Sequence, residues 1–237
     1  MFDKLAILKN KGYFPDTILD IGAHVGSWTN DMRRIYSECN YVLFDGFPYP
    51  ELRRFDNDSK VVVKNVILNE KPGKVEWYEN ISTGDSIFKE KTHHYENCLP
   101  STRFAYDLDT VISEFELCKN VENVFVKIDC QGGEIPILKG ASAILKKTDF
   151  ILLEIPLFGQ YNEGVASFSD HIVFMDSIGF AIYDLIDNHY INGFNMQVDA
   201  LFINKNHAFN RTVNELILLK SNPGQNQKIP GVENRYA

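Results

Sequence analysis

The chain has 237 residues, enough for one sizeable hydrophobic core, and its formal net charge is −8. This acidic balance and the lack of a long Lys/Arg run argue against nucleic acid or an anionic membrane as the main partner. No apolar run is long enough for a membrane helix, the charged N-terminus is unlike a signal peptide, and the cysteines form no C-x-x-C pair. We therefore expect a cytoplasmic protein with reduced thiols and no structural metal.

Strands and helices are predicted to alternate along the chain. Strands are predicted at 17–20, 41–44, 60–68, 73–78, 124–128, 150–154, 180–184 and 199–203. Helices are predicted at 3–11, 27–37, 50–55, 108–115, 134–147 and 170–178. This order predicts an α/β fold with a largely parallel sheet and helices on both faces.

Several segments carry more particular expectations. We expect the helix at 3–11 to cover a sheet edge, and the β-branched run at 60–68 to be a strand buried on both faces. Residues 80–106 are polar and irregular, which is typical of a functional or mobile loop. The sequence predicts a single domain over residues 1–220 and a flexible tail over residues 221–237, which are poor in apolar side chains.

The turn after the first predicted strand is the most informative part of the sequence. The strand ends on Asp20, and Gly22 and Gly26 follow with the spacing D-x-G-x-x-x-G. The dinucleotide fingerprint is instead G-x-G-x-x-G, with its acid about 20 residues later. A carboxylate beside free backbone N–H groups complements S-adenosylmethionine, which carries a sulfonium, an amine and a carboxylate. A plain turn between a strand and a helix is the alternative.

Polar residues stand where the predicted parallel strands end, and such ends meet at one edge of a sheet. They are Asp20, Asp45, Asn65, Asp129 and Glu154. Each could be a local helix cap or turn former, but five in succession favour a binding crevice. Asp45 could accept hydrogen bonds from both ribose hydroxyls of an adenosine, or it could merely open a turn with Gly46.

A second block of strand, acid, glycine turn and helix covers residues 126–141. Asp129 is predicted to face the crevice, where it could orient a substrate, accept a hydroxyl proton or help bind a divalent ion. Glu134 opens the following helix and is expected to stabilise its N-terminus rather than to act in catalysis.

With these motifs the chain resembles the FkbM family of S-adenosylmethionine-dependent methyltransferases. The resemblance rests on DIGAHVG at 20–26, FDGFP at 44–48, DLDTVI at 107–112 and KIDCQGGEIPILKGA at 127–141, followed by the strand that ends in Glu154. It covers roughly residues 15 to 160. The family commonly has Asn at the position of His24, and Glu-Pro at the position of Asp45 and Gly46.

The resemblance implies a class I methyltransferase fold: a Rossmann-like, doubly wound, mostly parallel seven-stranded sheet with an antiparallel last strand. It also implies S-adenosylmethionine as cofactor and methyl transfer to an oxygen of a small molecule, often a sugar. On this basis Asp20, Gly22 and Gly26 are predicted to line the amino-acid portion of the cofactor, and Asp45 is predicted to hold its ribose. Ala23 in the same turn and Asn65 at the next strand end are also predicted to bind the cofactor.

For a hydroxyl acceptor, the predicted catalytic residues are Asp129 and His94, with His93 as the neighbouring alternative on a loop that could close over the site. No metal ligand is predicted. One rival function is a nicotinamide-dependent oxidoreductase or epimerase, since the architecture is shared. The glycine spacing disfavours it. The other rival is a subunit that binds the cofactor without catalysing methyl transfer.

Overall fold

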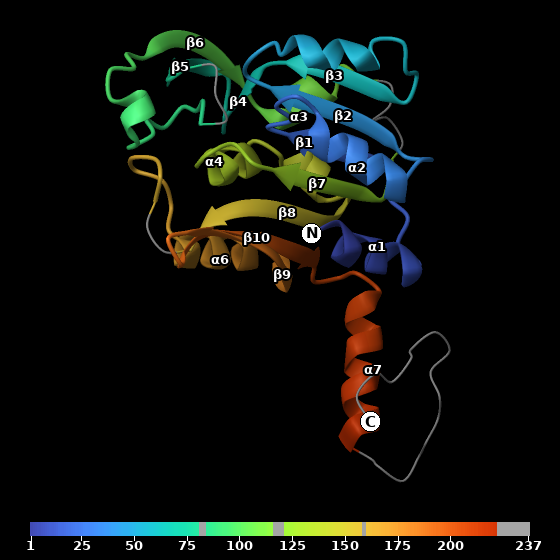
Figure 1. Cartoon of the computed structure of the whole chain (residues 1–237). Coiled ribbons are helices and arrows are strands. Elements are labelled where there is room, and N and C mark those ends of the chain that lie inside the picture. Colours follow the sequence, from blue (N-terminus) through green and yellow to red (C-terminus); the bar gives the residue numbers. More distant parts are fainter. Residues whose placement is uncertain (81–83, 116–120, 158–159, 222–237) are drawn as a thin grey trace.

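The computed structural model describes residues 1–80, 84–115, 121–157 and 160–221 (Figure 1). Its main element is a seven-stranded sheet with the order β3-β2-β1-β7-β8-β10-β9. These strands are β1 (Thr17–Ile21), β2 (Asn40–Asp45), β3 (Val61–Asn65), β7 (Val124–Ile128), β8 (Thr148–Pro156), β9 (Phe180–Ile191) and β10 (Phe194–Asn204). Neighbouring strands are parallel, except that β10 runs antiparallel to both β8 and β9. The predicted class I methyltransferase fold, with its reversed last strand, is confirmed.

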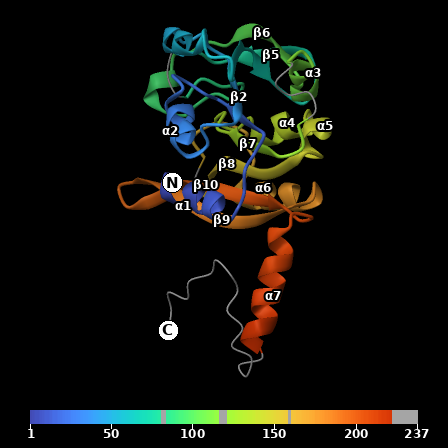
Figure 2. The same ribbon diagram turned by 90° about the vertical axis from the view of Figure 1, so that its right-hand side faces the viewer.

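Helices cover both faces of this sheet, so the molecule has three layers (Figure 2). One face carries α1 (Phe2–Asn10), α2 (Ser27–Ile35) and the 3₁₀ helix η1 (Pro50–Phe55). The other face carries α3 (Leu108–Ile112), α4 (Glu134–Lys139), α5 (Ser142–Leu145) and α6 (Phe168–Ser177). The last helix, α7 (Phe209–Ser221), projects away from the sheet.

Alternation along the strands explains the two hydrophobic cores. In β1, Ile18 packs into the core under α1 and α2, whereas Leu19 packs into the core under α3 and α4. Leu5 of α1 is fully buried in the first core together with residues of all seven strands of this sheet. Helix α1 therefore packs on a face of the sheet, and it also reaches the edge strand β9, where Lys4 Nζ donates to the carbonyl oxygen of Leu185 at 2.8 Å.

The run at 60–68 is not one strand buried on both faces. Strand β3 is the edge of the main sheet and most of its residues are only half-buried. After Val66 the chain enters a second sheet of order β4-β6-β5, formed by β4 (Ile67–Leu68), β5 (Gly73–Trp77) and β6 (Ser101–Tyr106). Strand β6 lies within the stretch that was predicted to be irregular, and it is the central strand of this small sheet, parallel to β4 and antiparallel to β5.

Two other predicted elements differ in length. The helix predicted at 134–147 is interrupted at Gly140, where a Cβ would lie 2.6 Å from the carbonyl oxygen of Asn69. Strands β9 and β10 are longer than predicted and form a hairpin. Asn192 and Gly193 connect them with φ angles of 49° and 83°, the left-handed conformation that two-residue hairpin turns require.

Of the predicted tail, only Ser221 belongs to the described residues, as the end of α7; residues 222–237 lie outside them. Within the described residues, no helix combines the length and the apolar character that crossing a membrane would demand.

The turn after β1 needs glycine at position 22. Gly22 has a φ of +75°, and a Cβ on it would lie 1.9 Å from the carbonyl oxygen of Asp129. The ends of β1 and β7 can therefore approach each other only if this residue has no side chain.

We expect Gly22→Ala to lower the free energy of unfolding by about 2 kcal/mol or more. The alanine would have to adopt a left-handed backbone conformation, and its Cβ would clash with the carbonyl oxygen of Asp129. Chemical denaturation measures this change. Gly73→Ala is the matched control, since nothing lies within 4 Å of a Cβ there. Equal stability of the two variants would contradict the close approach of the turn to β7.

Candidate functional site

A cavity of about 430 Å³ lies at the carboxyl ends of β1, β2, β7 and β8. This is the edge at which parallel α/β sheets bind their ligands. Its charged walls are formed by acids, namely Asp45, Asp85, Asp129 and Glu154, and no Lys or Arg is found among its described lining residues. His24 also lines it. The electrostatic character of the cavity therefore favours a cation over a phosphate.

Asp45, at the end of β2, lies in the cavity wall with its carboxylate held in place. Its Oδ2 accepts a hydrogen bond of 2.7 Å from the backbone N–H of His24, and its Oδ1 accepts one of 2.9 Å from Phe47. Burial raises the pKa of Asp45 above its usual value, and these two N–H groups oppose the shift. A carboxylate keeps further lone pairs after two such bonds, so it can still accept hydrogen bonds from a ligand.

His24 acts in the site through its backbone N–H group, which holds the carboxylate of Asp45. Its φ is 49°, in the left-handed region where Asn is more readily accommodated than His. The ring lies edge-on against Tyr49, with centroids 4.5 Å apart, in the cavity wall.

The second sheet supplies an apolar wall next to Asp45. Ile67 of β4 and Trp77 of β5 both line the cavity and are buried. The indole ring of Trp77 lies against Gly46, where a Cβ would be 2.6 Å from the ring. The indole ring therefore leaves no room for a side chain at position 46. Its flat apolar surface suits a planar ring of a ligand.

Asp85 also lines the cavity and has one oxygen without a partner. Its Oδ1 accepts hydrogen bonds from Tyr95 (2.6 Å) and from the backbone of Asn80 (2.8 Å). Its Oδ2 is buried and has no hydrogen-bond partner among the described residues. A buried carboxylate oxygen in a cavity wall is a site for an N–H or O–H donor of a ligand.

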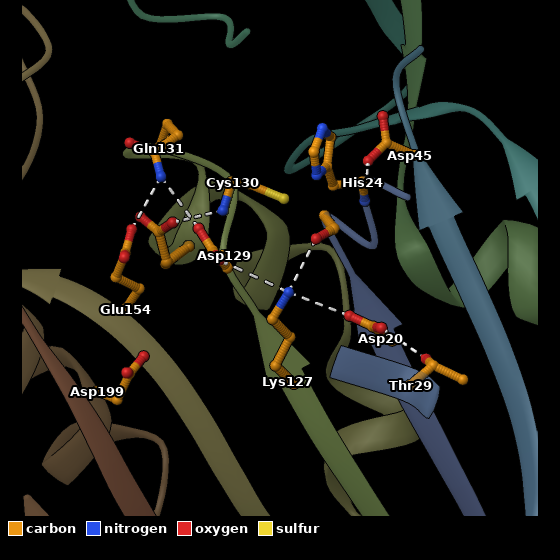
Figure 3. A network of polar contacts seen from close by, with 12 residues as sticks. Asp20, His24, Thr29, Asp45, Lys127, Asp129, Cys130, Gln131, Glu154 and Asp199 are labelled. Atoms are coloured by element: carbon orange, nitrogen blue, oxygen red, sulfur yellow. Dashed lines mark hydrogen bonds and ion pairs between the residues drawn. The ribbon is translucent and has the colours of Figure 1, made fainter. Parts of the chain in front are cut away.

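Asp20 lies below the cavity in a buried ion pair (Figure 3). Its Oδ1 is 3.1 Å from Nζ of Lys127, and its Oδ2 accepts a hydrogen bond of 2.6 Å from Thr29. Lys127 also donates to the carbonyl oxygen of Gly22 at 2.8 Å. Burial opposes the charged form of Lys127, but the carboxylates of Asp20 and Asp129 outweigh it and raise its pKa.

The structure places the predicted cofactor-binding residues unevenly. Gly22 and Asp45 line the cavity, whereas the Asp20 carboxylate faces Lys127 and Thr29 and is not among the described lining residues. Direct contact of Asp20 with a ligand stays a prediction, and its geometry favours an indirect role through Lys127.

Three other predicted cofactor residues are not among the described lining residues either. Ala23 is buried in the core under α2. Gly26 is the N-cap residue of α2 and packs against η1. A Cβ on Gly26 would lie 2.9 Å from the ring of Phe55. The exposed side chain of Asn65 donates a hydrogen bond of 2.8 Å to the carbonyl oxygen of Asp45 and so helps to fix the backbone of that residue.

Asp129 and Glu154 form the polar end of the cavity, opposite Asp45 (Figure 3). Gln131 Nε2 bridges them, donating to Asp129 Oδ1 at 3.0 Å and to Glu154 Oε2 at 2.8 Å. Gln197 on β10 donates to the same Glu154 oxygen at 3.0 Å. Burial, and then the charge of Asp129, raises the pKa of Glu154 well above its usual value.

A segment after β5 lies across the cavity next to the glycine turn of β7. Ser86 donates hydrogen bonds to the carbonyl oxygens of Cys130 (3.2 Å) and Gln131 (3.0 Å). Tyr161 lines the cavity from the chain that follows β8. Residues 81–83 and 158–159 lie outside the described residues.

His94 does not stand in this cavity wall. It belongs to the 3₁₀ helix η2 (His93–Tyr95), where its ring is exposed and lies 3.9 Å from that of His93. The short helix is anchored by the fully buried Tyr95. A catalytic role of His94 stays a prediction.

Several cavity residues were not predicted from the sequence. Gln131 follows Asp129 directly and could have been found by extending the turn motif. Trp77, Asp85 and Gln197 stand on segments that carry no motif, and only pairing of the second sheet and the β9–β10 hairpin brings them here. Within the described residues, no three or more His, Cys, Asp and Glu side chains are grouped so as to hold a metal ion.

Comparison with protein families identifies the chain. The model of the methyltransferase FkbM domain matches residues 20–182, which include Asp20, Asp45, Asp129 and Glu154. The chain belongs to the FkbM family of S-adenosylmethionine-dependent methyltransferases. S-adenosylmethionine, predicted from the sequence resemblance, is the cofactor of this family. No curated protein matches the chain.

Solved structures include several that resemble this FkbM-family chain. A methyltransferase FkbM from Methylobacillus flagellatus KT is 16% identical, with a TM-score of 0.48 over 80% of this chain, which spans only 43% of that protein. The 1,6-didemethyltoxoflavin-N1-methyltransferase of Burkholderia thailandensis, with bound S-adenosylhomocysteine, is 10% identical (TM-score 0.49; 85% of this chain, 76% of that one). Magnesium protoporphyrin IX methyltransferase of Synechocystis PCC 6803, also with bound S-adenosylhomocysteine, is 7% identical (TM-score 0.45; 85% and 80%).

We expect Lys127→Met to lower the free energy of unfolding by roughly 3–5 kcal/mol, because it leaves the buried Asp20 carboxylate without its cation. The double variant Asp20→Asn/Lys127→Met should recover part of this loss, since no unpaired charge remains. Urea denaturation measures both.

Lys4→Met is the control, because the exposed ion pair of Lys4 with Asp184 contributes less than about 1 kcal/mol. If Lys127→Met lowered the free energy of unfolding no more than this control, the buried ion pair would not stabilise the turn.

Proposed function

We propose that this chain transfers the methyl group of S-adenosylmethionine to a hydroxyl group of a small, uncharged acceptor such as a sugar. The observation that carries the proposal is the acid-lined cavity at the carboxyl ends of the central strands. S-adenosylmethionine supplies a methyl group on a positively charged sulfur. Four carboxyl groups and no described Lys or Arg around the cavity suit this charge.

Residues of the cavity wall would suit the ribose and adenine parts of such a molecule. Asp45 would accept hydrogen bonds from the ribose hydroxyls, and the apolar wall around Trp77 would cover the adenine ring. The unpartnered oxygen of Asp85 is suited to an N–H donor on that side. The cavity volume of about 430 Å³ lies in the range of ordinary small-molecule sites.

Asp129 is proposed as the group that takes the proton of the acceptor. It lies at the end of β7 in the cavity wall, and its side chain is about one-third exposed (36%), so an acceptor can reach it. Positioning of acceptor and methyl carbon would provide much of the rate, with proton removal adding to it.

The acidic cavity also bears on the rival functions. A nicotinamide dinucleotide carries two negative phosphates, and the described cavity walls offer them no cation. The nicotinamide-dependent function is therefore disfavoured by charge as well as by glycine spacing. A subunit that binds the cofactor without catalysis would differ only in the outcome of a transfer assay.

We expect Asp45→Ala to weaken binding of S-adenosylhomocysteine about 10- to 100-fold, because it removes charge-assisted hydrogen bonds to the ribose. Isothermal titration calorimetry measures the affinity, with NAD as a comparison ligand. Asp56→Ala, an exposed acid after η1, is the matched control. An unchanged affinity in Asp45→Ala would remove the ribose role, and binding of NAD alone would favour the oxidoreductase.

We expect Asp129→Asn to reduce methyl transfer about 100-fold or more while S-adenosylmethionine still binds, because the amide cannot take up the acceptor proton. The assay follows labelled methyl groups from S-adenosylmethionine into small molecules of a cell extract. Asp56→Asn should transfer at the rate of the unmodified protein. Full activity of Asp129→Asn would exclude Asp129 as the base, and an inactive unmodified protein that binds the cofactor would favour the non-catalytic subunit.

A further inference from the structure

Asp129 and Glu154 stand side by side at the polar end of the cavity (Figure 3). They follow the paired residues Ile128 and Leu153 of the neighbouring parallel strands β7 and β8, and the side-chain amide of Gln131 donates a hydrogen bond to each of their carboxyl groups, at 3.0 Å and 2.8 Å. Two ionised carboxylates that share one hydrogen-bond donor lie close enough to repel each other, and a single proton held by the pair relieves this repulsion.

The hydrogen-bond donors around Glu154 indicate where this proton lies. Gln131 and Gln197 both donate to Oε2 of Glu154, at 2.8 Å and 3.0 Å. An oxygen that accepts two amide N–H groups has the bonding of a carbonyl or carboxylate oxygen, which leaves Oε1 to carry the proton. Gln131 also donates to Oδ1 of Asp129 at 3.0 Å, so one amide holds both carboxyl groups in place.

Other charged groups face Glu154 from the elements packed around it. From the hairpin, His189 of β9 places Nε2 3.8 Å from Glu154 Oε1 but only 3.1 Å from Oδ2 of Asp199 on β10. His189 is therefore closer to Asp199, and Asp199 adds negative charge beside Glu154.

From the other side, Glu134 of α4 adds a further negative charge near Glu154. Lys127 lies 3.7 Å from Asp129 but 3.1 Å from Asp20, so its charge is shared with the deeper acid. Burial and these neighbours raise the pKa of Glu154, in agreement with a proton held by the pair.

We propose that Glu154 is a second catalytic residue: its pair with Asp129 holds one proton until a sulfonium cation enters the cavity, releases it then, and afterwards takes the proton of the acceptor. The inference rests on the proposed function. A positive charge within several ångströms favours the ionised form of a carboxyl group over its protonated form. The base would thus be generated by the binding of the methyl donor itself.

The balance of the transfer step agrees with this cycle. As the acceptor oxygen bonds to the methyl carbon, the electrons of the broken carbon–sulfur bond stay on sulfur and the hydroxyl proton passes to the carboxyl pair. The cavity loses one positive charge and the pair gains one proton, so the pair returns to the state it had before the donor bound. S-adenosylhomocysteine, whose sulfur is neutral, has no sulfonium charge to displace that proton.

The test is calorimetry of the full-length protein with S-adenosylmethionine and with S-adenosylhomocysteine, in buffers of different ionisation enthalpy near neutral pH. The buffer dependence of the binding enthalpy counts the protons released. We expect S-adenosylmethionine to release up to about one proton more than S-adenosylhomocysteine in the unmodified protein. In Glu154→Gln this excess should disappear, apart from the part that belongs to the ligands themselves.

Three further variants sharpen the result. Asp129→Asn breaks the pair from its other side and should suppress the same excess, which keeps the test decisive if Glu154→Gln does not fold. Glu51→Gln, an exposed acid on η1, is the matched control and should release protons like the unmodified protein. Loss of the excess in Asp199→Asn but not in Glu154→Gln would overturn the inference in favour of the Asp199–His189 pair.

Two more outcomes separate this inference from the proposed function. If both ligands bind and the excess is the same in the unmodified protein and in Glu154→Gln, the proton cycle is wrong while methyl transfer stands. If neither ligand binds, the proposed function fails and this inference fails with it.

Discussion

The geometry of the site depends on the contacts of one buried ammonium group, that of Lys127. It joins Asp20 at the end of β1, the carbonyl oxygen of Gly22 in the turn and, at a longer distance, Asp129 at the end of β7. Each of these groups would be costly to bury without a partner. Together they fix the first turn against the neighbouring strand, and they keep the charge of Asp20 away from the ligand cavity.

A second constraint is the small sheet that follows β3. It carries Ile67 and Trp77 to one side of the cavity, and the chain beyond it reaches the glycine turn of β7 through Ser86. The main sheet provides the acids at its strand ends, and this addition provides the apolar cover. The two chemical halves of the cavity thus come from different parts of the chain, which meet only in the fold.

The sequence was sufficient to predict the parts that local pattern determines. Alternating β-branched runs and helical periodicity indicated the main strands, and the acids at their ends indicated Asp45 and Asp129 as cavity residues. Family resemblance indicated the reversed strand β10. Hydrophobic periodicity and acids at strand ends are local patterns of neighbouring residues, so they can be recognised in a single sequence.

The parts that failed depend on contacts between distant segments. The edge position of β3 cannot be read from its β-branched residues, which would suit a central strand equally well. His94 was predicted as a catalytic residue because it stands on a long loop that could close over the site, whereas the buried Tyr95 beside it determines where that short helix lies. Gln197 reaches Glu154 only because β10 inserts between β8 and β9.

The packing of Trp77 on Gly46 has an evolutionary consequence. The indole fills the space that a side chain at position 46 would need, so the two residues are epistatic: a larger residue at one position is tolerated only with a smaller one at the other. A chain with the Glu-Pro pair common in the FkbM family must therefore shape this wall differently.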